Sequence, residues 1–289
     1  LCKPGVSVVK PSYGFPGASI VFEGQEFVSS KTLYTLTFGT STDKAEIVGT
    51  PIDTEFMAKI PETAVSGVMT LVMAEQTIDL TSYPFTVLKH ATLDIPKEDE
   101  PVPSGFAGSK FAITGTNLVQ ELLDKSVEGL EPLKVTFFKA GGEPVEAAID
   151  TDNLTDKSIP LTVPASLEAG DYTITVITQF ETIGTQLKYT VLPMPTVTGI
   201  STKAGYINTE VTIIGQNFGT KAENIQVFFG ETVCDKVTLN DKGNIVVNVP
   251  KGVSIQGKEI EMGESGTFEV WELRKSLLLK HRIFILMAH

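Results

Sequence analysis

The chain has 289 residues, of which 42% are hydrophobic and 20% are charged, a composition typical of globular domains and long enough for two or three of them. Its 35 acidic and 23 basic residues give a net charge of −12, which disfavours binding to the phosphate backbone of a nucleic acid. No uninterrupted apolar run reaches the roughly 18–20 residues that a membrane-spanning helix needs.

The first cysteine stands at the start of the chain, which opens at Leu1 without a methionine, as expected after processing or trimming of a preceding segment. Bacterial lipoproteins are acylated on an N-terminal cysteine, so Cys2 is a candidate lipidation site. Leu1, however, is not the small residue that usually precedes such a cysteine. The second cysteine, Cys234, lies far along the chain; we expect no disulfide between the two, and a buried structural thiol at Cys234.

An opening motif occurs three times along the chain. In each copy an aromatic residue is followed nine residues later by a glycine, and an apolar residue stands three positions beyond that glycine. The copies are FPGASIVFEGQEF (15–27), FAGSKFAITGTNL (106–118) and YINTEVTIIGQNF (206–218), with the glycines Gly24, Gly115 and Gly215. The glycines are 91 and then 100 residues apart, which is the length of one sandwich domain and too long for a solenoid repeat.

Each copy continues with the same order of elements. Strands that end in aromatic residues are predicted over 33–39, 133–138 and 225–230, and extended segments then lead to Pro61, Pro164 and Pro250. Closing strands are predicted over 83–89, 187–193 and, less regularly, 281–287. Apolar and polar residues alternate in these segments, as around Ile20 and Phe22, which indicates strands with one buried face. One helical turn is expected within 118–130, as an insertion in the second copy.

These elements predict an all-β chain of three tandem immunoglobulin-like β-sandwich domains in an elongated array. The expected domains are residues 1–90, 91–193 and 194–289. Charged residues and three prolines follow the first boundary, and Pro193 and Pro195 stand at the second. Such short, proline-bounded connections favour a semi-rigid rod over loosely joined domains.

The repeated pattern resembles the IPT/TIG family of immunoglobulin-like domains. The third copy carries it most clearly, in EVTIIGQNFGTKAENIQVFFGETV followed by NIVVNVPKGVSIQG. The second matches in FAITGTNL and LTVPASLEAGDYTITV, and the first departs most, with VFEGQEF as its glycine strand. The glycine of this pattern is expected where the strand bulges or turns, and the aromatic or leucine after it at the end of the sandwich.

The resemblance covers nearly the whole chain and implies a fold more strongly than a function. The family occurs in transcription factors, plexin-like receptors, starch-acting enzymes and many bacterial surface proteins. The lack of a basic loop argues against the DNA-binding members, and the scarcity of cysteine argues against the receptors. Tandem, acidic, cysteine-poor copies resemble the multidomain surface lipoproteins of Bacteroidetes glycan-uptake systems, in which such domains hold a glycan-binding module away from the membrane.

The sequence contains no recognisable catalytic motif. Its three histidines are His90, His281 and His289. They show neither a metal-ligand spacing nor a neighbouring nucleophile, and we interpret each as a chance residue at a domain edge. We therefore predict a protein that is not an enzyme and that needs no cofactor.

One acidic stretch invites comparison with a calcium loop, because Asp150, Asp152 and Asp156 alternate as calcium ligands do. Leu154, however, occupies a ligand position, and the glycine that permits the sharp turn of such a loop is missing. A solvated turn is the favoured interpretation, and no metal site is predicted.

Carbohydrate binding usually needs exposed aromatic faces, because the apolar face of a pyranose stacks on a flat ring. The chain has one tryptophan, Trp271, which is the candidate carbohydrate-binding residue, with a core or edge position as the alternative. Most tyrosines are expected in phase with the core, including Tyr172, Tyr189 and the repeat-opening Tyr206. For the apolar, basic tail over 270–289, closing strands, an amphipathic binding segment and an altered end all stay open.

Together these observations predict a non-catalytic bacterial cell-surface lipoprotein, exported and lipid-anchored in the outer membrane, that contributes to polysaccharide capture in a glycan-uptake system. The expected partners are a polysaccharide and an outer-membrane transporter or another surface protein. No nucleic acid is expected, and contact with the membrane is expected only through the lipid anchor. The first alternative is a structural adhesin or protein-interaction spacer without a carbohydrate role, and the second is an accessory module of a larger starch- or glycan-acting enzyme.

Overall fold

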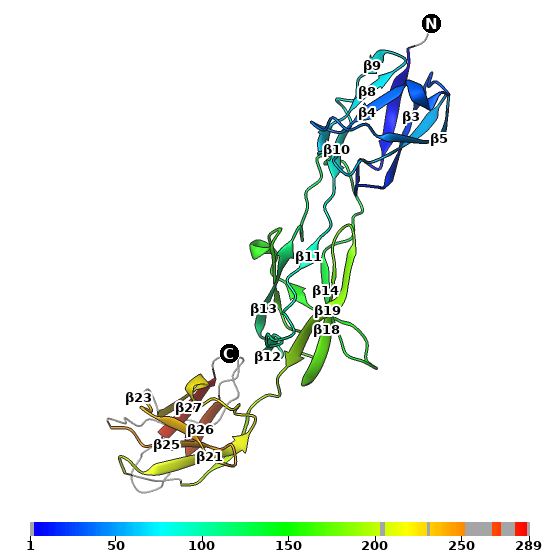
Figure 1. The fold of residues 1–289 in the computed structure, drawn as a ribbon. Coiled ribbons are helices and arrows are strands. Elements are labelled where there is room, and N and C mark those ends of the chain that lie inside the picture. The colour runs from blue at the N-terminus through cyan, green and yellow to red at the C-terminus, as the bar shows by residue number, and fades with distance from the viewer. Residues whose placement is uncertain (1–2, 203–205, 230–231, 252–267, 273–280, 288–289) are drawn as a thin grey trace.

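The computed structural model describes residues 3–202, 206–229, 232–251, 268–272 and 281–287, with the backbone alone for 184–186 and for the last two ranges. The described chain is all-β, as predicted, and its helices are the three 3-10 turns η1 (Lys31–Leu33), η2 (Thr151–Asn153) and η3 (Ala222–Asn224). Among these residues no helix has the length and apolar character to span a membrane. The strands follow one another in three groups along an elongated molecule (Figure 1).

The first group, which we call the first unit, contains β1 to β10. One sheet has the order β1-β3-β6-β5, and the others have the orders β2-β10-β7 and β4-β8-β9. The strands are β1 (Gly5–Lys10), β2 (Tyr13–Gly14), β3 (Ser19–Gln25), β4 (Tyr34–Thr37), β5 (Glu46–Ile52), β6 (Glu55–Lys59), β7 (Gly67–Val68), β8 (Thr70–Met73), β9 (Gln76–Ile78) and β10 (Pro84–Val87).

The second unit contains β11 to β19 and forms two sheets, with the orders β11-β13-β17-β16 and β12-β19-β18-β14-β15. Its closing strand β19 pairs in parallel with the short β12, as β10 pairs with β2 in the first unit. The strands are β11 (Thr92–Leu93), β12 (Ser104–Gly105), β13 (Lys110–Thr116), β14 (Lys134–Phe138), β15 (Val145–Glu146), β16 (Ala148–Ile149), β17 (Ser158–Thr162), β18 (Gly170–Ile177) and β19 (Thr182–Val191).

The third unit contains β20 to β27, in sheets of order β20-β21-β25-β24 and β23-β22-β27-β26. The strands are β20 (Thr196–Ile200), β21 (Glu210–Gln216), β22 (Ile225–Phe229), β23 (Thr232–Val233), β24 (Val237–Leu239), β25 (Ile245–Asn248), β26 (Phe268–Glu272) and β27 (His281–Met287). The apolar tail thus supplies two strands, and the last of them lies between β22 and β26. In the second unit the order differs: the closing strand β19 lies between β12 and β18, and β18 is the strand that pairs with β14.

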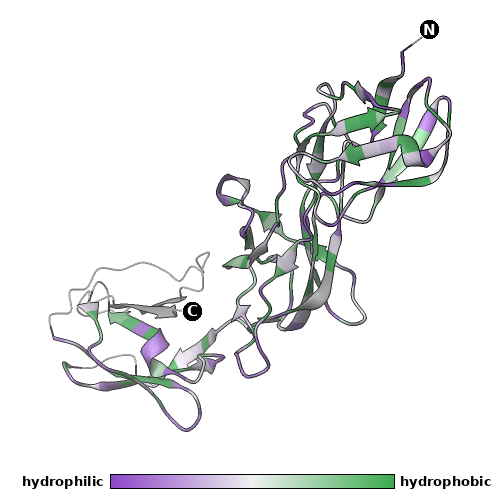
Figure 2. Cartoon of the chain, turned by 45° about the horizontal axis from the view of Figure 1, so that its top comes forward, coloured by the Kyte–Doolittle hydropathy of each residue, from purple (hydrophilic) through white to green (hydrophobic). Residues whose placement is uncertain are grey.

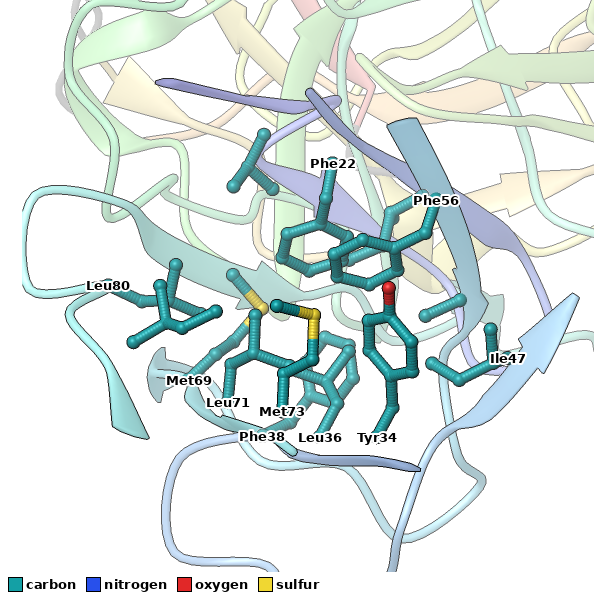
Figure 3. Packing of buried hydrophobic residues seen from close by; sticks show 14 of the residues in the cluster. Phe22, Tyr34, Leu36, Phe38, Ile47, Phe56, Met69, Leu71, Met73 and Leu80 are labelled. Atoms are coloured by element: carbon teal, nitrogen blue, oxygen red, sulfur yellow. The ribbon is translucent and has the colours of Figure 1, made fainter. Parts of the chain in front are cut away.

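Most buried hydrophobic residues that the structure describes form three separate clusters, one within each unit; Leu88 and Leu122 are buried outside them. In the first unit Phe22 stacks on Phe56 with ring centroids 4.5 Å apart, and Tyr34 packs against the same ring (Figure 3). Ile20 and Phe22 are both fully buried, which confirms the predicted alternation along β3. Hydrophobic residues recur along the strands of every unit (Figure 2). The exact domain limits at residues 90 and 193 stay a prediction.

The motif glycines are required by the close approach of a neighbouring strand. A Cβ atom on Gly24, Gly115 or Gly215 would lie far inside van der Waals contact of a carbonyl oxygen of the first strand of the same unit. In the first and third units, a bulge in that first strand lies opposite the glycine. The apolar residues three positions later are all buried, namely Phe27, Leu118 and Phe218. The burial of the later residue is as predicted, whereas the bulge lies in the neighbouring strand, in two of the three units, and the glycine itself is required by the close approach of that strand.

The opening turn of each unit is also the same. The carbonyl oxygens of Phe15, Phe106 and Tyr206 each accept a hydrogen bond from the amide three residues later, at 3.0–3.1 Å. A positive φ follows at Gly17, Gly108 and Asn208, as a type II turn requires at its third residue. The amide at that position donates to the residue before Pro61, Pro164 or Pro250. The opening turn of every unit is thus tied to its proline segment.

The segment 118–130 was predicted to contain a helical turn, and this prediction is wrong: the segment is irregular. Asp124 accepts hydrogen bonds from the backbone N–H and the hydroxyl of Ser126, at 3.0 and 2.6 Å, which is the turn that a helix-breaking Asp-x-Ser sequence favours. The leucines that suggested a helix are divided between environments, because Leu118 and Leu122 are buried and Leu123 is exposed.

Candidate functional site: the joint between the first two units

The connection from the first unit to the second leaves beside the opening turn of the first unit. Leu88 is buried, and its amide donates to the carbonyl of Gly14 at 2.9 Å. Two segments of the second unit reach this connection, the cyan chain between β10 and β11 in Figure 1. We call Thr178–Glu181, between β18 and β19, the hairpin tip, and residues 117–126, after β13, the clamp loop. Together they make the joint.

The hairpin tip presents Glu181 to the connection. Thr178 shapes the tip, because its hydroxyl accepts hydrogen bonds from the amides of Phe180 and Glu181 and its own amide donates to the carbonyl of Glu181. One carboxylate oxygen of Glu181 then lies 2.9 Å from Nδ1 of His90, and the other accepts from the amide of Ala91 at 2.6 Å. A residue 91 positions away in the sequence thereby fixes the connection on one side.

The clamp loop holds the connection on another side. The side-chain amide of Gln120 bonds twice to the backbone of Lys89, accepting from its N–H at 2.8 Å and donating to its carbonyl at 2.7 Å. The amide of Leu123 donates to the hydroxyl of Thr86 at 2.8 Å, which satisfies a buried polar side chain of the first unit.

Further contacts of the clamp loop bridge the two units. Hydrogen bonds from Ser126 and from Ser12 of the first unit lower the pKa of the Asp124 carboxyl. The side chain of Asn117 donates to the carbonyl of His90 at 3.0 Å. Asn217 repeats this contact at the start of the third unit, donating to the carbonyl of Met194 at 3.0 Å.

Aromatic rings complete the joint. The ring of Phe15, in the opening turn of the first unit, stacks on His90 with centroids 4.3 Å apart and an angle of 4° between the planes. The ring of Tyr13 packs against Phe180 of the hairpin tip at 5.4 Å. Such aromatic contacts add about 0.5–1.5 kcal/mol each beyond the area they bury, and each hydrogen bond adds about 1 kcal/mol. Bending at the joint would have to break these contacts.

The third unit gives the clearest match to known proteins. Residues 195–276 match the family model of the IPT/TIG domain. This chain carries an IPT/TIG domain. The predicted family is confirmed on the unit whose motif was clearest in the sequence. The glycine, the opening turn and the buried plug of that IPT/TIG domain recur with the same geometry in the two units before it.

No curated protein matches the chain in sequence. Among solved structures, the chain is similar to the extracellular region of plexin A4, with a TM-score of 0.35 and 16% identity over 90% of this chain and 22% of that one. It is similar to a protein crystallised with a xylogluco-oligosaccharide, with a TM-score of 0.35 and 16% identity over 93% and 57%.

A third similar structure is SGBP-B of the mixed-linkage glucan utilization locus of Bacteroides ovatus, in complex with a mixed-linkage heptasaccharide. Its TM-score is 0.25, with 21% identity over 68% of this chain and 47% of that one. The chain therefore spans between 22% and 57% of the length of these three proteins.

The predicted carbohydrate-binding residue, Trp271, lies in β26 of the IPT/TIG domain, and its register partner in β27 is Arg282. Phe284, two positions along β27, pairs with Phe228 of β22. Positions that pair across neighbouring strands, and positions two apart on one strand, share a face of the sheet. The register therefore puts Trp271, Phe284 and Phe228 at positions of one face, although the side chain of Trp271 lies outside the described residues.

The other predicted site residues are placed as follows. Cys2 and His289 lie outside the described residues, and His281 begins β27. In the Asp150–Asp156 stretch, Asp150 accepts a hydrogen bond from the side chain of Asn153 at 3.0 Å. Across the described residues no three His, Cys, Asp or Glu side chains are grouped so as to hold a metal ion.

Two residues differ from the interpretation of the sequence. His90 was interpreted as a chance residue at a domain edge, but it stacks on Phe15 and contacts Glu181 in the joint. Tyr206 was expected in phase with the core of the IPT/TIG domain, but 91% of its surface is exposed. Tyr206 lies on a turn, whereas Tyr172 and Tyr189 lie on alternating strands that place every second side chain in the core.

Sequence reasoning missed Glu181 and Gln120, two residues whose side chains bond to the connection. Both are polar residues in loops, and each contacts a partner far away in the sequence. The one available signal was the extra length of the second copy, which the structure explains in part by the clamp loop.

Proposed function

We propose that this chain is a non-catalytic, extended part of a bacterial cell-surface protein that takes part in polysaccharide capture. In this proposal the chain is exported and held at the outer membrane through a lipid on Cys2, and it works beside a transporter or another surface protein. The observation that carries the proposal is the joint, in which the second unit grips the connection from two sides with the hairpin tip and the clamp loop.

The joint suits a spacer because a spacer works only if its length is kept. A flexible connection would let successive domains fold back on one another, whereas a stiff one keeps their ends apart. The clamp loop is extra chain in the second unit, and four of its residues bond to the first unit or to the connection. Its contacts serve the relative placement of the units in addition to the core of its own unit.

The role in polysaccharide capture is supported by the face of the IPT/TIG domain to which the register assigns Trp271, Phe284 and Phe228. Neighbouring aromatic positions on a sheet offer flat rings on which successive pyranose units can stack. The saccharides bound in two of the similar structures indicate which ligands to try first; the proposal itself rests on this chain's own residues.

Calorimetric titration with soluble mixed-linkage β-glucan and xyloglucan tests the proposal. We expect heat of binding with at least one polysaccharide, and a weaker affinity in Trp271→Ala, because the stacking face is removed. Phe138→Ala is the matched control, since Phe138 is an exposed aromatic residue of the second unit and should not matter. We also expect no release of reducing sugar from the polysaccharide during the titration.

The outcomes separate the two functions that the joint suits. Binding that survives Trp271→Ala keeps the function and moves the site to another face. The absence of binding to any polysaccharide would favour the alternative, a structural adhesin or protein-interaction spacer, to which the rigid joint is equally suited.

A further inference from the structure

In the first two units the chain leaves the unit beside the opening turn, and in the first unit the aromatic ring of that turn contacts the departing chain. In the first unit the amide of Leu88 donates to Gly14, and in the second the amide of Leu192 donates to Gly105, so each exit lies next to the opening turn. In the first unit the ring of Phe15 accepts a flat partner, since the imidazole of His90 stacks on it almost parallel at 4.3 Å.

Tyr206 holds the same position in the third unit. The turn around it has the same backbone hydrogen bonds, from Thr209 to Tyr206 and from Asn208 to Val249. Its ring, however, is 91% exposed, and the next residue, Ile207, is 54% exposed. Within the described part of the chain no ring stacks on Tyr206. A turn that offers one face of an aromatic ring for stacking is therefore present in the third unit with that face open to solvent.

Polar groups suited to sugar hydroxyls lie on the same turn and at the adjoining end of β21 and β25. The side-chain amide of Asn248 donates to the carbonyl of Asn208, two residues after Tyr206, at 3.0 Å, which leaves the amide oxygen of Asn248 as an acceptor. Glu210 pairs with Asn248 across β21 and β25, and both residues are exposed. An exposed ring with an amide and a carboxylate close by in the sequence and in the strand register offers what a saccharide site uses: the ring for the apolar face of a pyranose and the polar groups for its hydroxyls.

We propose that Tyr206, with Asn248 and Glu210, forms a subsite for a neutral hexopyranose of a polysaccharide chain at the end of the third unit. This proposal rests on the proposed function and names a site for it distinct from the face of Trp271. The sugar ring would occupy the place that His90 occupies on Phe15 in the first unit.

The test uses the full chain titrated with mixed-linkage β-glucan and, separately, with xyloglucan. Tyr206→Ala should weaken binding about tenfold or more, because a stacking face is lost, and Tyr206→Phe should retain most of the affinity. Phe138→Ala serves again as the control. The exposure of Tyr206 means that the substitution removes few contacts of the folded chain, and an unchanged unfolding temperature verifies this.

Each outcome has one meaning. Weaker binding in Tyr206→Ala with retention in Tyr206→Phe supports the subsite. Unchanged affinity in Tyr206→Ala, while the unaltered chain binds, overturns the subsite alone and leaves the ring available for contact with a protein module. If the unaltered chain binds neither polysaccharide, the subsite and the glycan role of the proposed function fall together.

Discussion

The residue two positions after each motif glycine adopts a left-handed backbone conformation, and the residue type at this position differs between the units. The second and third units use asparagine, at Asn117 with φ 54° and Asn217 with φ 63°. Both side chains also donate to a carbonyl just before the first strand of their unit. The first unit has Glu26 at φ 56°, and there only a long 3.5 Å contact from Gln25 reaches the corresponding carbonyl, that of Lys3. Glutamate is costly here, because side chains other than asparagine and aspartate rarely adopt this conformation.

Glu26→Asn should therefore stabilise the first unit by about 0.5–1 kcal/mol, since asparagine tolerates the left-handed conformation and can supply the missing hydrogen bond. Urea denaturation of the full chain measures the effect. The reciprocal change, Asn117→Glu, should destabilise the second unit by a similar amount. A decrease in stability for Glu26→Asn would contradict the equivalence of the three positions.

Gly215→Ala should destabilise the third unit by about 3 kcal/mol, because the new methyl group would collide with the carbonyl of Thr196 and the ring of Phe218. Gly199→Ala is the matched control in the same sheet, where an added Cβ meets no atom within 4 Å and stability should change little. Thermal unfolding compares the two variants, and an equal effect of both would show that close approach is not what the motif glycine provides.

Cys234 is buried against the core of the third unit, and burial, assisted by the charge of Asp235, raises the pKa of its thiol to about 11. Since the thiolate is the reactive form, we expect Cys234 to resist a thiol reagent at pH 8 in the folded protein and to react in denaturant. The measurement uses a Cys2→Ser background to remove the other thiol. Rapid reaction of the folded protein would mean that the thiol is accessible.

At the scale of the elements, the joint depends on two loops of the second unit, the hairpin tip and the clamp loop, whose polar side chains bond outside their own unit. The amides of Lys89 and Ala91 in the connection donate to the side chains of Gln120 and Glu181, respectively. Protection of these two amides therefore measures how firmly the two loops hold the connection. Both acceptors are side chains of loop residues, so each can be removed by substitution without changing a strand residue.

The substitutions Gln120→Ala and Glu181→Ala should each speed the exchange of the amide hydrogen that loses its acceptor, at Lys89 and Ala91 respectively, by about tenfold. Hydrogen exchange followed by NMR measures this. Glu121→Ala is the control on the same loop, because Glu121 is exposed and its ion pair is with Lys125 on the same loop. Equal exchange rates in all variants would show that the two side chains do not hold the connection.

The sequence predicts the features that depend on neighbouring residues, and it does not predict those that depend on residues far away in the chain. The alternation at Ile20 and Phe22 and the motif glycines are local patterns, and they led to strands that the structure contains, with the bulges in the strands opposite Gly24 and Gly215. The clamp loop was mistaken for a helical turn, because the spacing of Leu118 and Leu122 fits a helix while their burial comes from tertiary contacts. Glu181 left no signal at all, since its partner lies 91 residues away.

At the scale of the whole molecule, the described chain is a succession of small β-sheet units. Each unit has its own buried core, so most of the buried apolar surface lies within the units. The contacts of the joint therefore serve the placement of the first unit on the second. A stiff pair of domains would extend whatever it carries by a fixed length, as capture at a cell surface demands.

The most direct test of this account is the distribution of distances between two spin labels, at Thr77 in the first unit and Lys188 in the second, measured by electron paramagnetic resonance in the Cys2→Ser background. Both positions are exposed. We predict a single narrow distribution that broadens when Gln120→Ala and Glu181→Ala are combined. A broad distribution in the unaltered chain would show that the joint does not fix the two units, and it would contradict the proposed spacer role.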